Sequence, residues 1–149
     1  MQWTDKRSIK LSTWCIYILA ALIIGVMIFI SGFLDAIVPN QVINVKNRYL
    51  FIITLELCLG IGLIILYFLN KLIKNIENEK TFNERNILLL RITSWFCFLE
   101  ALILLVSSSY YFPWFFVAGV AAFMGVIVRI IKNVFCQALL IKEENDFTI

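Results

Sequence analysis

The stretch Tyr49–Leu69, YLFIITLELCLGIGLIILYFL, decides the fold of this chain, because it is long, apolar and carries one charged residue, Glu56. An α-helix needs about 20 such residues to cross roughly 30 Å of hydrocarbon. Three further apolar segments cover about residues 11–34, 92–112 and 114–132, the last ending in cations whose long side chains can reach the membrane surface. The sequence therefore predicts an all-α integral membrane four-helix bundle.

The composition argues against a water-soluble chain. Apolar residues form 62% of the sequence and charged residues 15%, against about a half and a quarter in soluble proteins. The first apolar segment is longer than the roughly 7 to 15 residues of a signal peptide's core, so we expect a retained span. With 149 residues, the chain is predicted to form one membrane domain over residues 1–149.

The positions of the lysines and arginines predict the orientation. Eleven of the thirteen lie before the first span, in the loop at about residues 70–91, or from the end of the fourth span onward. Only Lys46 and Arg48 lie in the other two connections. Basic residues favour the cytoplasmic side, so the N- and C-termini are predicted to be inside. The segment Ser107–Trp114, which contains proline and aromatic residues, suits a tight hairpin at the opposite lipid headgroups.

The second and fourth helices are predicted to continue beyond the membrane as short cytoplasmic extensions. Apolar residues recur at helical spacing from Leu69 to Ile76, and again up to about Lys142. The third helix can begin at an N-cap formed by Thr81 or by Asn83. The cytoplasmic tail covers about residues 133–149, and its ending, Lys142–Ile149, is acidic until its last three residues. It is either a solvated end or a docking segment that uses Phe147 and Ile149.

Three ionisable residues in the predicted spans form a candidate intramembrane polar site: Glu56, Glu100 and Arg129. Such residues are costly in hydrocarbon and mark a proton, cation or ligand site, unless they form structural hydrogen bonds or ion pairs. Glu100 and Arg129 are predicted within roughly two helical turns of each other in depth, so they could neutralise each other. Glu56 has no obvious basic partner in the membrane, which makes it the stronger functional candidate.

Motifs for catalysis, metal binding or cofactor binding are absent from the sequence. The chain has no histidine, no paired carboxylate motif and no glycine-rich phosphate loop, so we predict no enzyme and no cofactor. The basic residues flank spans instead of forming a patch, which argues against direct nucleic-acid binding. No metal site is predicted from the four cysteines, which are far apart in the sequence and suit apolar packing: Cys15, Cys58, Cys97 and Cys136.

Small residues predict close helix contacts. Ala118, Ala122 and Gly125 share one face of the fourth helix, a spacing that permits two helices to approach closely. The contact is expected within the bundle, with a homo-oligomer as the alternative. The spans otherwise face the lipid bilayer, which is the first partner that the sequence implies.

Two motifs resemble a known family. The first runs from Ile76-Glu77-Asn78 through Phe82 and Asn86 to Leu90-Arg91-Ile92, and the second is the ending Lys142–Ile149, KEENDFTI. Together they resemble bacterial domain-of-unknown-function family 2975, over nearly the whole chain in its four-span layout. Three positions depart from the family pattern: Glu79 stands where glycine is usual, Asn83 where threonine is usual, and Phe147 where leucine is commoner.

The resemblance implies a multi-pass protein of the bacterial cytoplasmic membrane with no assigned activity. Members are often encoded beside small helix-turn-helix transcription regulators, which suggests a membrane partner of such a soluble regulator. The alternatives are a small transporter or ion-coupled protein that uses Glu56 and Glu100, or an immunity or envelope-protection protein. The candidate partner-docking residues are Glu77, Asn78, Phe82, Asn86, Arg91, Glu143, Glu144, Asn145, Asp146, Phe147 and Ile149.

Overall fold

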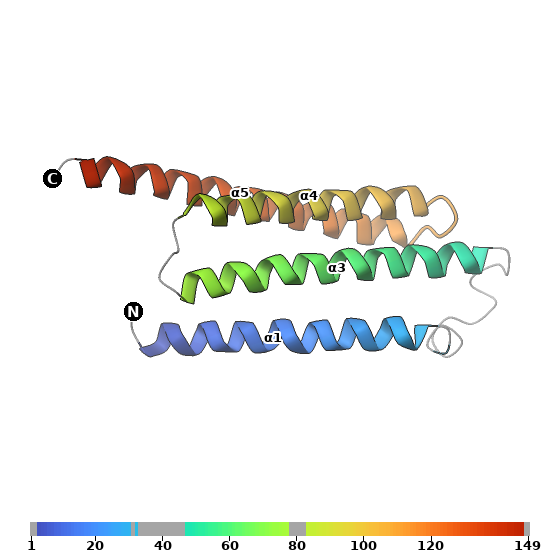
Figure 1. Cartoon of the computed structure of the whole chain (residues 1–149). Coiled ribbons are helices and arrows are strands. Elements are labelled where there is room, and N and C mark those ends of the chain that lie inside the picture. Colours follow the sequence, from blue (N-terminus) through green and yellow to red (C-terminus); the bar gives the residue numbers. More distant parts are fainter. Residues whose placement is uncertain (1–2, 31, 33–46, 78–82, 148–149) are drawn as a thin grey trace.

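The computed structural model describes residues 3–30, 32, 47–77 and 83–147, and its long elements are all helices (Figure 1). These helices run up and down in succession, so the start of α1 and the end of α5 lie at the same end of the molecule. Each of the four is long and apolar enough to cross a membrane. They are α1 (Trp3–Ile28), α3 (Arg48–Glu77), α4 (Glu84–Ser107) and α5 (Trp114–Phe147). The predicted all-α fold of four apolar helices is confirmed.

Two helices are longer than a bilayer requires. Helix α3 has 30 residues and α5 has 34, which correspond to about 45 Å and 51 Å at about 1.5 Å per residue. Hydrocarbon accounts for only about 30 Å of that length. Both helices therefore have the predicted extensions. The chain after residue 132 continues as helix to Phe147, beyond the predicted end of this extension at about Lys142.

The ends of two helices differ from the predicted spans. The first helix covers Trp3–Ile28, whereas the expected span was 11–34, whose last two residues lie outside the described part of the chain. Helix α4 ends at Ser107 and not at Phe112, because the chain turns there. The amides of Tyr110 and Tyr111 both donate to the Ser107 carbonyl oxygen at 3.3 Å, and the Trp114 amide donates to the Tyr111 carbonyl oxygen at 3.1 Å. These bonds form the short hairpin that precedes α5.

The helices pack in the order of the chain. Helix α1 lies beside α3, α3 beside α4, and α4 beside α5, which is the most extensive contact of the three. Helix α1 meets α3 at Gly62, where an added Cβ would lie 3.8 Å from Ile23 Cδ1. None of the described side chains at positions 7–28 is buried. Helix α1 therefore lies at the edge of the bundle.

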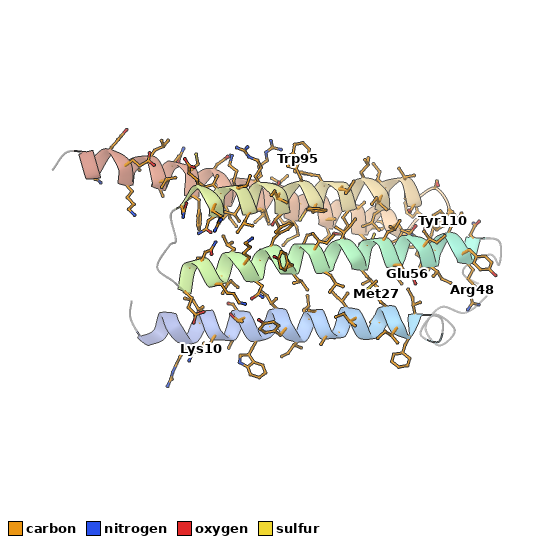
Figure 2. The ribbon with its side chains drawn as sticks, in the orientation of Figure 1. Lys10, Met27, Arg48, Glu56, Trp95 and Tyr110 are labelled. Carbon is orange, nitrogen blue, oxygen red and sulfur yellow. The ribbon has the colours of Figure 1, made fainter. Side chains whose placement is uncertain are left out.

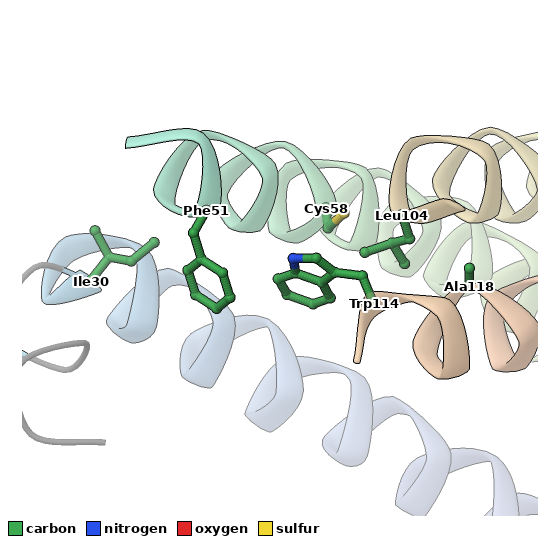
Figure 3. Close-up of a cluster of buried hydrophobic side chains, with 6 residues drawn as sticks. All are labelled: Ile30, Phe51, Cys58, Leu104, Trp114 and Ala118. Atoms are coloured by element: carbon green, nitrogen blue, oxygen red, sulfur yellow. The ribbon is translucent and has the colours of Figure 1, made fainter. Parts of the chain in front are cut away.

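A cluster of buried side chains fixes the hairpin end of the bundle (Figure 3). The rings of Phe51 and Trp114 stack with their centroids 5.1 Å apart, which joins α3 to α5. The Tyr110 hydroxyl donates to Thr54 Oγ1 at 2.7 Å, and Thr54 Oγ1 lies 3.1 Å from Ser107 Oγ. The cluster consists of Ile30, Phe51, Cys58, Leu104, Trp114 and Ala118. The predicted hairpin is therefore attached to α3 as well as to α4.

The contact between α4 and α5 depends on a glycine. The Ser94 hydroxyl of α4 donates to the Gly125 carbonyl oxygen of α5 at 3.1 Å. A Cβ at Gly125 would lie 3.1 to 3.2 Å from three ring carbons of Phe98. Glycine thus permits the approach that this interhelical bond requires. At this position the small-residue face contacts a helix of the same chain, as the intramolecular interpretation predicts.

We expect Gly125→Leu to destabilise the α4–α5 pair by about 1 to 3 kcal/mol, because the larger side chain must displace the Phe98 ring. The midpoint of unfolding in detergent, followed by circular dichroism, measures the effect. Gly119→Leu is the matched control on the same helix, since nothing lies within 4 Å of an added Cβ there. Equal midpoints for the two variants would contradict this account of the contact.

Candidate functional site

We call the end of the molecule that holds the end of α3, the start of α4 and the end of α5 the platform end (Figure 1). A hydrogen-bonded pair of amide side chains connects two of these elements. Asn75 Nδ2 of α3 donates to Asn86 Oδ1 of α4 at 2.7 Å, and Asn86 is 0% exposed. A buried amide without such a partner would cost about 1 to 3 kcal/mol. The pair therefore fixes the position of the first turn of α4 relative to the end of α3.

Helix α4 begins at a capped residue. Asn83 has an extended backbone, with φ −145° and ψ 146°, and its Oδ1 accepts from the Arg85 amide at 3.3 Å. Its carbonyl oxygen accepts from the amides of Asn86 and Ile87. Asparagine satisfies free amides at a helix start in this way. Of the two N-caps that the sequence left open, the structure has Asn83, while Thr81 lies outside the described residues.

Helices α4 and α5 form a groove at the platform end, with a volume of about 640 Å³. We call it the platform groove. Apolar side chains from both helices line it between charged ones, two arginines and two glutamates. Its lining residues are Asn83, Glu84, Arg85, Ile87, Leu88, Arg91, Cys136, Leu139, Leu140 and Glu143.

The lengths of α4 and α5 place the platform groove, by expectation, at and beyond the membrane surface. Counting about 20 residues from the hairpin end brings the far hydrocarbon boundary to roughly Leu88 on α4 and Asn133 on α5. The segment Cys136–Glu143 lies past that point. The groove thus combines an apolar strip with charged sides in a region that is open to water. An amphipathic helix with apolar residues at i, i+3 and i+4 suits such a surface.

The predicted docking residues fall into different places. Arg91 and Glu143 line the platform groove, and Glu77, Glu144 and Asn145 are exposed near it in the sequence. Asn86 is a correction to the docking set, because its buried amide holds two helices together and is not on a surface. Helix α5 reaches Phe147, but the side chains of Asp146 and Phe147 are not described, and Asn78, Phe82 and Ile149 lie outside the described residues.

Sequence reasoning missed most of the groove, because only Arg91 and Glu143 among its lining residues were docking candidates. The available signal was the apolar stripe along the fourth helix, which includes Leu139. That stripe shows which face of α5 is apolar, but only the tertiary structure shows that α4 packs beside it and completes the groove.

The structure does not bring the three intramembrane ionisable residues together. Glu56 is exposed and projects from α3 on the side of α1, whereas Glu100 is half-buried in α4 (Figure 2). The Arg129 guanidinium carbon lies 5.6 Å from the centre of the Trp95 ring, a cation–π contact. Glu100 and Arg129, both described, form no ion pair with each other, so the expected mutual neutralisation is absent.

Among the described residues, no three His, Cys, Asp or Glu side chains are grouped in a way that could hold a metal ion. The four cysteines are free thiols: Cys58 and Cys97 are buried, Cys15 is exposed, and Cys136 is half-buried beside the platform groove. The burial of Cys58 and Cys97 agrees with the predicted role of cysteine in apolar packing.

Four helices long and apolar enough to cross a bilayer, joined by polar and small-residue contacts, define a multi-pass helical membrane protein. The chain belongs to the family described as protein of unknown function (DUF2975), which matches residues 44–149. No curated protein and no solved structure matches the chain. The matched segment contains α3, α4 and α5 but does not include α1. The match is therefore narrower than the nearly complete coverage that the two motifs suggested.

We expect Asn86→Ala to lower the free energy of unfolding by about 1 to 3 kcal/mol, because Asn75 would lose its buried partner. The exposed residue Asn145 provides the control, and Asn145→Ala should change stability by less than about 0.5 kcal/mol. A double variant with Asn75→Ala should cost less than the sum of the single changes. Strictly additive losses would mean that the two amides are not coupled.

Proposed function

We propose that this protein has no catalytic activity of its own and acts as the membrane partner of a soluble cytoplasmic regulator, which it binds in the platform groove. The proposal rests on the platform groove, which has a volume of about 640 Å³ and an apolar strip between charged sides. The groove is located where α4 and α5 are expected to leave the membrane. The family resemblance supports the choice of partner, since members are often encoded beside helix-turn-helix regulators.

The chemistry of the groove suits a helix of such a regulator. Ile87, Leu88 and Leu139 supply apolar contacts for the buried face of an incoming helix. Arg85 and Arg91 can pair with its acidic residues, while Glu84 and Glu143 can pair with its basic ones. Charge pairs of both signs at the edges fix the direction and register of a helix that apolar contacts alone would leave free to slide.

The predicted orientation supports the same proposal. Eleven of thirteen basic residues lie on the side of the termini or in the α3–α4 connection, which favours the cytoplasm for the platform end. A regulator held there is kept from DNA until it is released. The protein is accordingly proposed to reside in the cytoplasmic membrane.

We expect Leu140→Glu to abolish recovery of a helix-turn-helix regulator in a cross-linked pull-down from native membranes, because it places a charge on the apolar strip. The matched control is Ile141→Glu. Leu140 and Ile141 are neighbours on α5 with exposed fractions of 56% and 59%, but only Leu140 lines the groove. Equal recovery with both variants would refute the groove as the docking site.

Truncation of the chain after Lys142 removes Glu143 from the groove, together with the rest of the acidic ending. We expect the truncated chain to retain less regulator than the full chain and to alter expression of the regulator's target genes. If neither measurement changes, and flux through reconstituted proteoliposomes is lost in Glu56→Gln, the transport alternative replaces this proposal.

A further inference from the structure

Helix α5 has a long face that is largely uncovered. Apolar residues and one glutamine recur along it at alternating intervals of four and three, the heptad spacing of a helix that packs along another helix. Six of these side chains are 56 to 65% exposed. We call this surface the α5 heptad face, and its residues are Phe116, Val120, Phe123, Ile127, Ile130, Val134, Gln137 and Ile141.

The α5 heptad face lies opposite the face that packs on α4. Gly125 marks the α4 side, since it contacts Ser94 and Phe98. Phe116 precedes Gly125 by nine residues and Val134 follows it by nine, which is about two and a half turns. Both side chains therefore project away from α4. A helix placed on the α5 heptad face would leave α4 and the platform groove undisturbed.

The charged residues of α5 avoid this face. In the heptad notation a to g, the face consists of positions a and d, and each a position holds valine or isoleucine. Such β-branched residues at a are typical of two helices that pair in parallel. The charged residues from Trp114 to Glu143 stand at b, c and f, which point away from a partner helix: Arg129, Lys132, Lys142 and Glu143. Two such faces can therefore meet without opposing like charges as far as Ile141, since Glu144 is the next residue of the repeat.

The α5 heptad face continues from hydrocarbon into water without a change of register. Phe116 and Ile141 are about 38 Å apart along the axis, which exceeds the roughly 30 Å of hydrocarbon. With the platform-side boundary expected near Asn133, Ile141 lies about 12 Å beyond it. Helix α5 there runs past the end of α3 and the start of α4 (Figure 1). Lipid chains can cover the part inside the membrane, but not Ile141, which is 59% exposed.

A partner that covers the whole face must itself cross the bilayer and continue as a helix into the water at the platform end. A second copy of α5 in the same orientation has this length, the same apolar register and the same boundary. A soluble protein would reach only the end of the face, and lipid would cover only the part in hydrocarbon. The continuity of the face therefore favours a second copy.

We propose that two copies of this chain associate in parallel through the α5 heptad face. Gln137 is the single polar residue of the face, so it meets its counterpart across the two-fold axis and fixes the register of the pair. Each copy keeps its platform groove on the side of α5 away from the axis. The dimer goes beyond the proposed function and does not depend on it.

Cysteine cross-linking in native membranes tests the interface. Ile141→Cys and Lys142→Cys place thiols at neighbouring exposed positions, the first on the α5 heptad face and the second beside it. Mild oxidation should convert most of the Ile141→Cys chain to a disulfide-linked dimer, because residues at a face their counterparts in a parallel pair. Val134→Cys should behave in the same way. Lys142→Cys should give no more dimer than the unaltered chain, whose own cysteines set the background.

Sedimentation equilibrium in detergent measures the strength of the dimer. Ile141→Glu should raise its dissociation constant by about tenfold or more, because the change places a carboxylate on an apolar contact. Leu140→Glu is the matched control, since Leu140 stands at g, a position at which coiled coils often carry glutamate, and its dimer should persist. The regulator pull-down should give the opposite order, with recovery lost in Leu140→Glu and kept in Ile141→Glu. Failure of the dimer and failure of the proposed function are therefore distinguishable.

The dimer would be overturned if the unaltered chain sedimented as a monomer throughout, or if Ile141→Cys and Lys142→Cys cross-linked equally. A dissociation constant that Ile141→Glu leaves unchanged would place any dimer contact elsewhere, and would overturn the proposal as well. A disulfide from Ile141→Cys to a different protein would assign the α5 heptad face to another partner, with the same consequence.

Discussion

Hydrogen bonding of the backbone inside hydrocarbon is the constraint on which this structure depends. A span without water must satisfy its own amides and carbonyls, so each apolar segment becomes a helix. The same solvent removes the usual force between helices, since lipid is as apolar as leucine. Contact between helices then relies on polar bonds and close approach. Three polar contacts do this among the described residues from α3 to α5, at different depths: Thr54 with Ser107 and Tyr110, Ser94 with the Gly125 carbonyl, and Asn75 with Asn86.

These contacts all lie between residues 54 and 125, inside the segment that the family match covers. Helix α1 lies at the edge of α3, with no buried side chain among those described at positions 7–28, and its hydrogen bond to α3, from Asn70 Nδ2 to the Tyr17 hydroxyl, is long at 3.5 Å. The three connected helices form the part whose geometry is most firmly determined by internal bonds. The platform groove is built from two of them, α4 and α5, and the proposed function therefore rests on this pair.

The α4–α5 pair presents two chemically different surfaces along one seam. Within the membrane the seam is apolar and opened by Gly119, whereas at the platform end it alternates apolar and charged side chains. Arg91 lies between the two regions, where hydrocarbon gives way to headgroups.

The sequence by itself determined the number of helices, their apolar character and the extensions of α3 and α5, because these depend on residues that are close in the chain. It also identified Asn83 as one of two possible caps and the small-residue face at Gly125. Only the tertiary structure decided that Asn86 is buried, that Arg129 rests on Trp95 instead of pairing with Glu100, and that α4 completes the platform groove. The reason is rotational: hydropathy fixes where a helix crosses the membrane, but only packing against its neighbours fixes how it turns about its own axis and which side chains meet.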